Sequence, residues 1–167
     1  MKFLTDGMLG NITRWLRLLG YDVEYEPLDD DRALLLRSKL EGRILLTSDI
    51  ELFRIAKRRG LEAVLIKGTS TAETLSRLSR KLKLPLSFDE LRSRCPTCGS
   101  PITRVTTGSV QEKVPKRTYE TYNRFWACTN PSCSKVYWRG SHWTKIRKTL
   151  VKARQGKRGV EETEPRR

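Results

Sequence analysis

The stretch Arg43-Ile-Leu-Leu-Thr-Ser-Asp49-Ile-Glu-Leu-Phe53 predicts a short buried strand, over residues 43–47, that turns directly into a helix. Its unbroken apolar run, residues 44–46, is typical of a parallel strand covered on both faces. Ser48 and Glu51 form a capping box, which predicts a helix beginning at this point. Asp49 therefore follows the carboxyl end of a strand, the edge of an open α/β sheet where ligands bind. Such an acid can hold a metal, or it can simply complement the helix dipole.

The same alternation of strand and helix extends over the first half of the chain. Strands are predicted at residues 2–5, 22–25, 43–47 and 63–66, and helices at about 8–19, 32–41, 49–59 and 70–82. Repeated units of this kind predict a parallel, three-layer α/β domain over residues 1–85. Residues 86–94 are predicted to be a linker, with one helical turn opened by a capping box of Ser87 and Glu90.

Four cysteines occur in two close pairs, Cys95-Pro-Thr-Cys98 and Cys128-Thr-Asn-Pro-Ser-Cys133. Two such pairs can offer four thiolates to one tetrahedral ion, which predicts a structural zinc site in a small ribbon over residues 95–143. Disulfides are the weaker interpretation because nothing in the sequence indicates secretion. A redox-active pair is also weaker because it belongs at the start of a helix in a βαβ unit.

The net charge of +15 is concentrated in the second half, where residues 91–167 hold 18 Lys or Arg against 5 Asp or Glu. This excess predicts affinity for a polyanion, and nucleic acid is favoured over a merely solubilising surface. A membrane surface is not expected, because the basic half lacks a long amphipathic helix with an apolar face. Neither a membrane-spanning run nor a signal peptide is recognisable, so we expect a soluble, cytoplasmic protein. Residues 144–167 are predicted to form a basic tail, helical at first and disordered from Gly156.

Aromatic rings and cations alternate in the ribbon and continue into the tail. Unpaired bases stack on such surfaces, although a small ribbon also needs some of its rings for its own core. The only histidine is a candidate general acid or RNA contact, but a lone histidine is more often structural. The predicted RNA contacts are Arg124, Trp126, Lys135, Trp138, Arg139, His142, Lys145, Arg147 and Lys148.

Acids follow three of the predicted strands: Asp6 the first, the run 29–31 the second, and Asp49 the third. Because the carboxyl ends of parallel strands meet at one edge, we expect these carboxylates to converge. Oxygen ligands of this kind suit Mg²⁺ or Mn²⁺, which can orient a phosphate and activate water. Each acid also has a plainer interpretation, with Asp6 as a turn former, Asp31 as a helix N-cap and Asp49 as a first-turn acid.

Taken together, these residues resemble the PIN-like RNase domain named after the C-terminal region of the Mut-seven exonuclease family. The resemblance covers nearly all of residues 2–143. It rests on the four cysteines and on Phe3-Leu-Thr-Asp6-Gly-Met-Leu-Gly10, Arg14-Trp-Leu-Arg-Leu-Leu-Gly-Tyr21, Gly42-Arg-Ile-Leu-Leu-Thr-Ser-Asp49 and Val136-Tyr-Trp-Arg-Gly-Ser-His-Trp143. It implies a PIN-type α/β nuclease domain fused to a zinc ribbon, with metal-dependent RNase activity.

The resemblance implies that Asp6, Asp31 and Asp49 are the catalytic acids that bind Mg²⁺ or Mn²⁺, with Asp30 and Glu51 as possible further ligands. Many PIN domains have a fourth acid after the next strand, but here that strand runs into Leu65-Ile-Lys-Gly68. Two functions therefore remain open: an endoribonuclease, and a non-catalytic factor that binds RNA, such as ribosomal RNA in the ribosome. A nuclease toxin of a toxin–antitoxin pair is less favoured, because such toxins generally lack the ribbon.

Overall fold

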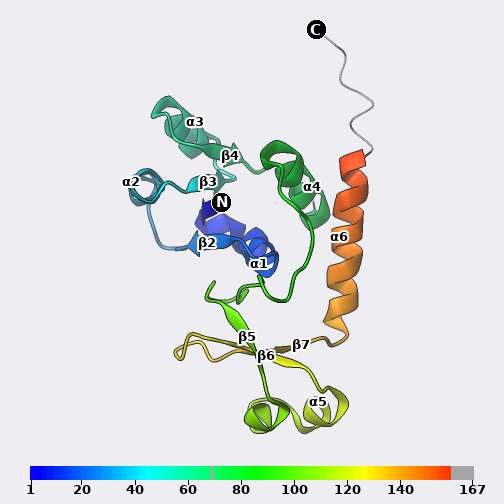
Figure 1. Cartoon of the computed structure of the whole chain (residues 1–167). Coiled ribbons are helices and arrows are strands. Elements are labelled where there is room, and N and C mark those ends of the chain that lie inside the picture. The colour runs from blue at the N-terminus through cyan, green and yellow to red at the C-terminus, as the bar shows by residue number, and fades with distance from the viewer. Residues whose placement is uncertain (69, 159–167) are drawn as a thin grey trace.

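The first half of the chain is an α/β domain built on a four-stranded parallel sheet (Figure 1). The computed structural model describes residues 1–68 and 70–158. The strands, in the spatial order β2-β1-β3-β4, are β1 (Lys2–Thr5), β2 (Asp22–Tyr25), β3 (Ile44–Thr47) and β4 (Ala63–Leu65). A 3-10 turn, η1 (Gly7–Leu9), precedes the first of the helices α1 (Gly10–Leu18), α2 (Asp31–Glu41), α3 (Ile50–Arg58) and α4 (Thr71–Leu82). The predicted parallel α/β architecture is confirmed.

Helices cover both faces of the sheet, so the domain has three layers. Phe3 and Leu46 face α1 and α4, whereas Leu4 and Leu45 face α2 and α3. All four side chains are completely buried. The apolar run of β3 thus reflects a central strand that packs on its two sides, as its sequence predicts.

Two helices begin on different residues from those the sequence suggests. Asp49, rather than Ser48, caps α3, because its carboxylate accepts hydrogen bonds from the amides of Glu51 (2.7 Å) and Leu52 (3.0 Å). The Ser48 amide is directed instead at a carboxylate that follows β1. Likewise, Asp30 caps α2 by accepting from the Ala33 amide (2.8 Å), so the helix starts one residue after the cap.

The second half contains a three-stranded antiparallel sheet, hereafter the ribbon, in the order β5-β6-β7. Its strands are β5 (Ile102–Val105), β6 (Phe125–Cys128) and β7 (Val136–Trp138). Between β5 and β6 lie a 3-10 turn, η2 (Thr107–Val110), and α5 (Lys116–Thr121), which close a small core at the far end of the ribbon in Figure 1. Residues 86–94 connect the two halves with turns. The single helical turn predicted there begins at Asp89 and not at Ser87, because the Asp89 carbonyl accepts from the amides of Arg92 and Ser93 and its carboxylate accepts from the Leu91 amide.

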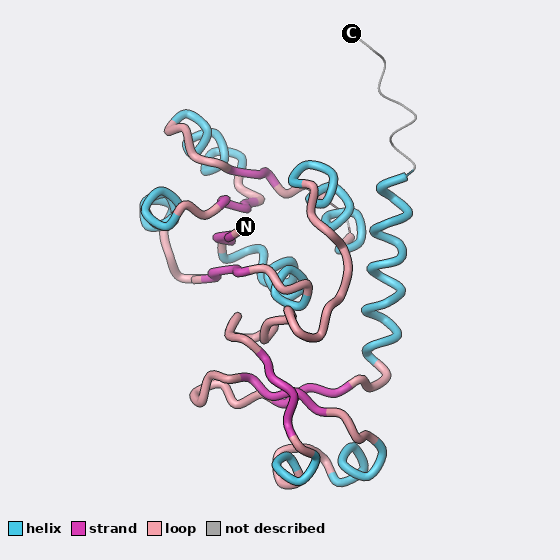
Figure 2. The backbone as a smooth tube through the Cα atoms, viewed as in Figure 1, coloured by secondary structure: helices cyan, strands magenta, loops and turns pink. Residues whose placement is uncertain are grey.

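The chain returns to the α/β domain through a long helix, α6 (His142–Arg158), which lies beside α4 in Figures 1 and 2. Leu150 and Ala153 are buried in the same core as α4. A Cβ atom on Gly156 would lie 3.2 Å from the Ser76 hydroxyl oxygen, so the helices are in close contact there. The predicted disorder from Gly156 is therefore wrong for residues 156–158, and residues 159–167 lie outside the described residues. No helix within the described ranges is both long and apolar enough to cross a bilayer.

A buried arginine of α1 joins the two halves. Arg17, only 4% exposed, donates to the Val23 carbonyl through Nε (3.0 Å) and Nη2 (2.8 Å). Its Nη1 donates to the carbonyls of Thr97 (2.8 Å) and Pro96 (3.4 Å), which lie between the first two cysteines. Its own carbonyl accepts from the Arg94 amide (2.9 Å). Burial lowers the pKa of this guanidinium below its usual value, and the side chain connects the α/β domain to the ribbon.

We expect Arg17→Met to lower the free energy of unfolding by about 3–5 kcal/mol, because carbonyl groups at the junction would lose charged donors. This corresponds to a fall in Tm of roughly 10 °C for a protein of this size. Thermal unfolding of the metal-loaded protein measures it. Arg58→Ala, which removes an exposed arginine at the end of α3, is the matched control, and equal Tm values for the two variants would contradict the role assigned to Arg17.

Candidate metal centre and acidic sheet edge

Asp6 follows β1 and is held rigidly at the carboxyl edge of the sheet, where β1, β2, β3 and β4 all end. Its side chain is 6% exposed. Oδ1 accepts from the Met8 amide (2.9 Å), and Oδ2 accepts from the Thr47 hydroxyl (2.5 Å) and the Ser48 amide (3.0 Å). The hydrogen bonds from β3 and the turn after it fix this carboxylate, which therefore does more than form the local turn with Gly7.

Asp49 lies on the other side of the same hydroxyl. Thr47 Oγ1, which donates to Asp6, accepts from the Asp49 amide (2.9 Å). Because β1 and β3 are neighbours in the sheet, one threonine connects the two acidic loops. Asp49 uses Oδ1 to cap α3, while its Oδ2 has no hydrogen-bond partner in the described part of the chain. The structure thus brings Asp6 and the Asp49 loop together.

The other predicted acids have different surroundings. Asp31 is the first residue of α2, its side chain is exposed, and its carboxylate forms no hydrogen bond or ion pair with residues 1–68 and 70–158. Asp30 is engaged in capping that helix, and Glu51 forms an exposed ion pair with Arg54 (2.6 Å). Asp29 is paired with Arg37 (3.1 Å). Among these candidates, therefore, Asp31 alone offers a wholly unengaged carboxylate.

Asp6, Asp31 and Asp49 follow three adjacent strands, but they do not form a compact group of ligands. In the described residues, the cysteines form the group of three or more His, Cys, Asp or Glu side chains close enough to hold a metal. Between α1 and α4, Asn11 donates to the Thr71 hydroxyl (2.8 Å). The acids consequently line an edge and do not enclose a cage.

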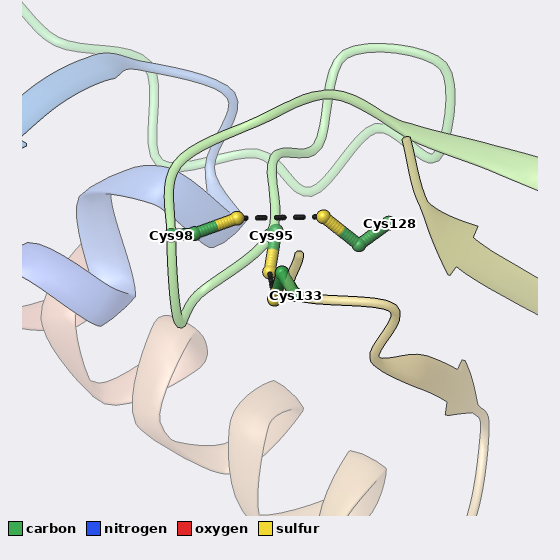
Figure 3. A group of neighbouring side chains, drawn as sticks. All are labelled: Cys95, Cys98, Cys128 and Cys133. Carbon is green, nitrogen blue, oxygen red and sulfur yellow. Dashed lines mark hydrogen bonds between the residues drawn. The ribbon is translucent and has the colours of Figure 1, made fainter. Parts of the chain in front are cut away.

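The four cysteine sulfurs converge at the end of the ribbon that faces the α/β domain (Figure 3). All lie within 4.8 Å of one another, with Sγ–Sγ distances of 3.7 Å for Cys95–Cys133 and 3.4 Å for Cys98–Cys128. Zn–S bonds of ~2.3 Å in a tetrahedron separate sulfurs by roughly 3.8 Å, whereas a disulfide requires ~2.05 Å. The thiols are unbridged, and their spacing is compatible with zinc.

The surroundings of the sulfurs differ in their effect on ionisation. Burial raises the pKa of the Cys128 and Cys133 thiols. Burial also opposes ionisation of Cys98, but hydrogen bonds from Ser100 and from the thiols of Cys128 and Cys133 together outweigh it and lower the pKa of Cys98 to about 6. The Tyr137 hydroxyl lies 3.0 Å from Cys95 Sγ, where it can donate to a thiolate. One thiol is thus poised to ionise, and two others need an ion to displace their protons.

The residues predicted to contact RNA do not form one surface. Five are exposed cations on the ribbon and on α6: Arg124, Lys135, Lys145, Arg147 and Lys148. The other four line a single cavity between the ribbon and the α/β domain: Trp126, Trp138, Arg139 and His142. The predicted RNA contacts therefore divide into an outward cationic surface and the wall of a cavity.

Other site residues were not recognised from the sequence as members of a site. The Thr47 hydroxyl links two acidic loops, and Arg14 and Trp15 line the cavity together with Asn11. A signal was present, because residues 11, 14 and 15 are spaced to share one face of a helix. Trp15 also packs partly against the core of the α/β domain.

Residues 1–150 match the family model described as the Mut7-C RNAse domain. No curated protein matches the chain, and neither does any solved structure. The match spans both the α/β domain and the ribbon, including every acid and cysteine discussed above.

We expect one Zn²⁺ to bind per chain and its affinity to fall as the pH falls. Because the pKa values of Cys128 and Cys133 are raised, binding must release their protons, and each proton released contributes a roughly tenfold loss of affinity per pH unit. Competition with a chromophoric chelator between about pH 6 and 8 measures this slope. Cys128→Ser should lose the ion, whereas retention of full affinity by that variant would contradict the four-thiolate site.

Proposed function

Because the chain belongs to the Mut7-C RNAse domain family, we propose that it is a ribonuclease on a PIN-like scaffold that hydrolyses RNA with the help of Mg²⁺ or Mn²⁺. The observation that carries the proposal is the connection of Asp6 to the Asp49 loop through Thr47 at the carboxyl edge of β1 and β3. Asp31 follows β2, the other neighbour of β1. The zinc site of the ribbon is structural, because four thiolates leave no open position.

The edge suits a hard cation even though its acids form no cage. Mg²⁺ keeps several waters and is commonly bound through one or two carboxylates together with substrate phosphates. Asp49 Oδ2 and the Asp31 carboxylate have no partner among the described side chains, so they are available as ligands. When bound, the ion supplies a polarised phosphate, an activated water and neutralisation of the charge that develops during displacement.

The protein residues have separate tasks at this edge. Asp6 cannot swing away, because three hydrogen bonds hold it, so it fixes the position of the centre. Thr47 orients the Asp49 loop through the same hydroxyl that holds Asp6. Asp31 is exposed at the start of α2, the helix that follows the neighbouring strand β2, and would supply a further oxygen ligand. Together they form a partly rigid set of oxygen ligands that the phosphate of RNA completes.

The outer side of α6 supplies affinity for the RNA backbone. Residues 142–158 contain no acid. Thr144, Arg147, Lys148, Val151 and Lys152 line one shallow groove on this helix. The opposite side of α6 packs on α4, so these cations lie in a row on the solvent-exposed side of the helix. Contacts from such cations to phosphates depend on charge and not on base identity.

Asp49→Asn and Asp31→Asn should each slow Mn²⁺-dependent cleavage of single-stranded or structured RNA by roughly 100-fold or more, which matches the several kcal/mol that metal charge stabilisation supplies. Initial rates on a labelled RNA measure the effect. Glu62→Gln is the matched control, because it removes an exposed acid at the opposite, amino edge beside β4.

Two results would contradict this function. Cleavage that survives in the double variant Asp6→Asn with Asp49→Asn would place the chemistry elsewhere. Tight, salt-dependent binding of RNA by the wild-type protein, without cleavage in any divalent cation, would indicate an RNA-binding factor instead of an enzyme.

The groove on α6 leads to a separate prediction about salt. Replacing Arg147, Lys148 and Lys152 with alanine should reduce the slope of log Kd against log salt by about 2, since each phosphate contact on single-stranded nucleic acid contributes ~0.7. Titration of RNA at several salt concentrations, without divalent cations, measures the slope. An unchanged slope would mean that this helix faces away from the RNA.

A further inference from the structure

A cavity of about 510 Å³ lies where α1, residues 88–96, the ribbon and the beginning of α6 meet. These elements converge between the α/β domain and the ribbon in Figure 1. All four tryptophans of the chain line it: Trp15, Trp126, Trp138 and Trp143. They come from α1, β6, β7 and α6, so the fold gathers them from four separate elements around one space.

One wall of the cavity is held in place by contacts of its own. Trp143 meets Phe88 edge to face, with ring centroids 4.4 Å apart at 72°. The Arg139 guanidinium lies over the rings of Trp143 (5.0 Å) and Trp126 (6.0 Å) and forms an ion pair with Glu90. Trp126 is 7% exposed. This wall is therefore already ordered, and its cation is used structurally.

A second cation of the cavity is uncommitted. Arg14 is exposed on α1 and forms no hydrogen bond or ion pair within the described residues. It lies between Asn11 and Trp15 on the helix face that lines the cavity, one turn of helix apart from Leu18. Across the space, His142 is exposed and packs against Trp138 with centroids 6.3 Å apart. Aromatic faces are thus combined with a free positive charge.

We infer that this cavity binds one unpaired nucleobase of an RNA strand, with Arg14 contacting the adjacent phosphate. The inference rests on the proposed function for RNA as the ligand. Stacking on aromatic rings and arginine planes is the usual way in which proteins hold a splayed-out base. The volume is that of a pocket for a small planar group, and the surplus of positive charge in the second half matches a polyanion.

The cavity is connected to the acidic edge by α1. This helix begins four residues after Asp6 and presents Asn11, near its start, to the cavity. Asn11 also contacts Thr71, the first residue of α4. An RNA strand with one base in the cavity can therefore continue along α1 to the carboxyl edge, so the cavity would set which phosphate is presented to Asp6 and Asp49.

Tryptophan fluorescence tests the inference directly, since every tryptophan lines the cavity. The probes are a short, end-labelled single-stranded oligoribonucleotide and an abasic oligomer with the same ribose–phosphate backbone, both added without divalent cations. Label anisotropy reports binding of either probe. We expect the base-containing probe to quench the fluorescence and the abasic probe to bind without quenching. Binding of the base-containing probe with unchanged fluorescence, or equal quenching by both, overturns the inference.

Variants identify the contacts, with Kd read from anisotropy. Trp15→Leu keeps an apolar side chain but removes the stacking face, and should raise Kd for the base-containing probe roughly 5- to 100-fold while leaving the abasic probe nearly unchanged. Arg14→Ala should raise Kd for both probes about fivefold, whereas Arg58→Ala, the control on α3, should stay within about twofold. Unchanged Kd values for Trp15→Leu and Arg14→Ala overturn the proposed site.

Cleavage by the wild-type protein in Mn²⁺ separates this inference from the proposed function. Cleavage without quenching would support the ribonuclease function and contradict the base site. Quenching without cleavage would support the base site and contradict the ribonuclease function.

Discussion

The relation between the α/β domain and the ribbon depends on one buried guanidinium. Arg17 donates on one side to the carbonyl of Val23, at the sheet, and on the other to carbonyls between Cys95 and Cys98. The turn around the cysteines must leave room for it. Gly99 has a φ of 82°, a conformation that favours glycine. A Cβ atom there would also lie 3.0 Å from Arg17 Nε, so glycine leaves the room that the guanidinium needs. Cys95 and Cys98 flank the same turn, so the cysteine cluster and the acceptors that Arg17 needs belong to one piece of backbone.

A second connection makes this junction rigid. The ribbon enters from the linker beside α1 and leaves into α6, whose buried face joins the core of the α/β domain. Because the ribbon is attached to the α/β domain at both its entry and its exit, the cationic side of α6 and the carboxyl edge of the sheet keep the same relative position. That constancy matters for a nuclease, because positioning of a phosphodiester against its catalytic groups can contribute as much to the rate as the groups themselves.

Local patterns predicted the elements well and their mutual contacts poorly. The apolar run of β3, the alternation of strand and helix, and the cysteine spacing are local signals, and they predict the parallel sheet and the cysteine cluster. The capping residue of α3 could not be predicted from the local sequence, because the Ser48 amide donates to Asp6, a residue 42 positions away. The packing of α6 on the α/β domain could not be predicted either, because the apolar residues that make it, Leu150 and Ala153, lie within a run of cations. Nothing in the sequence distinguishes the buried Arg17 from the exposed Arg14 one turn earlier.

The spread of the acids along the edge has a physical reason of its own. Three carboxylates gathered in one cage without a cation would repel one another. Here three donors hold the Asp6 carboxylate in place, whereas Asp31 stays exposed at the start of α2. An edge of this kind binds a hard cation well only when a phosphate supplies further oxygens. If a base is held in the tryptophan-lined cavity as proposed, its binding energy would deliver that phosphate, and the RNA itself would complete the proposed centre.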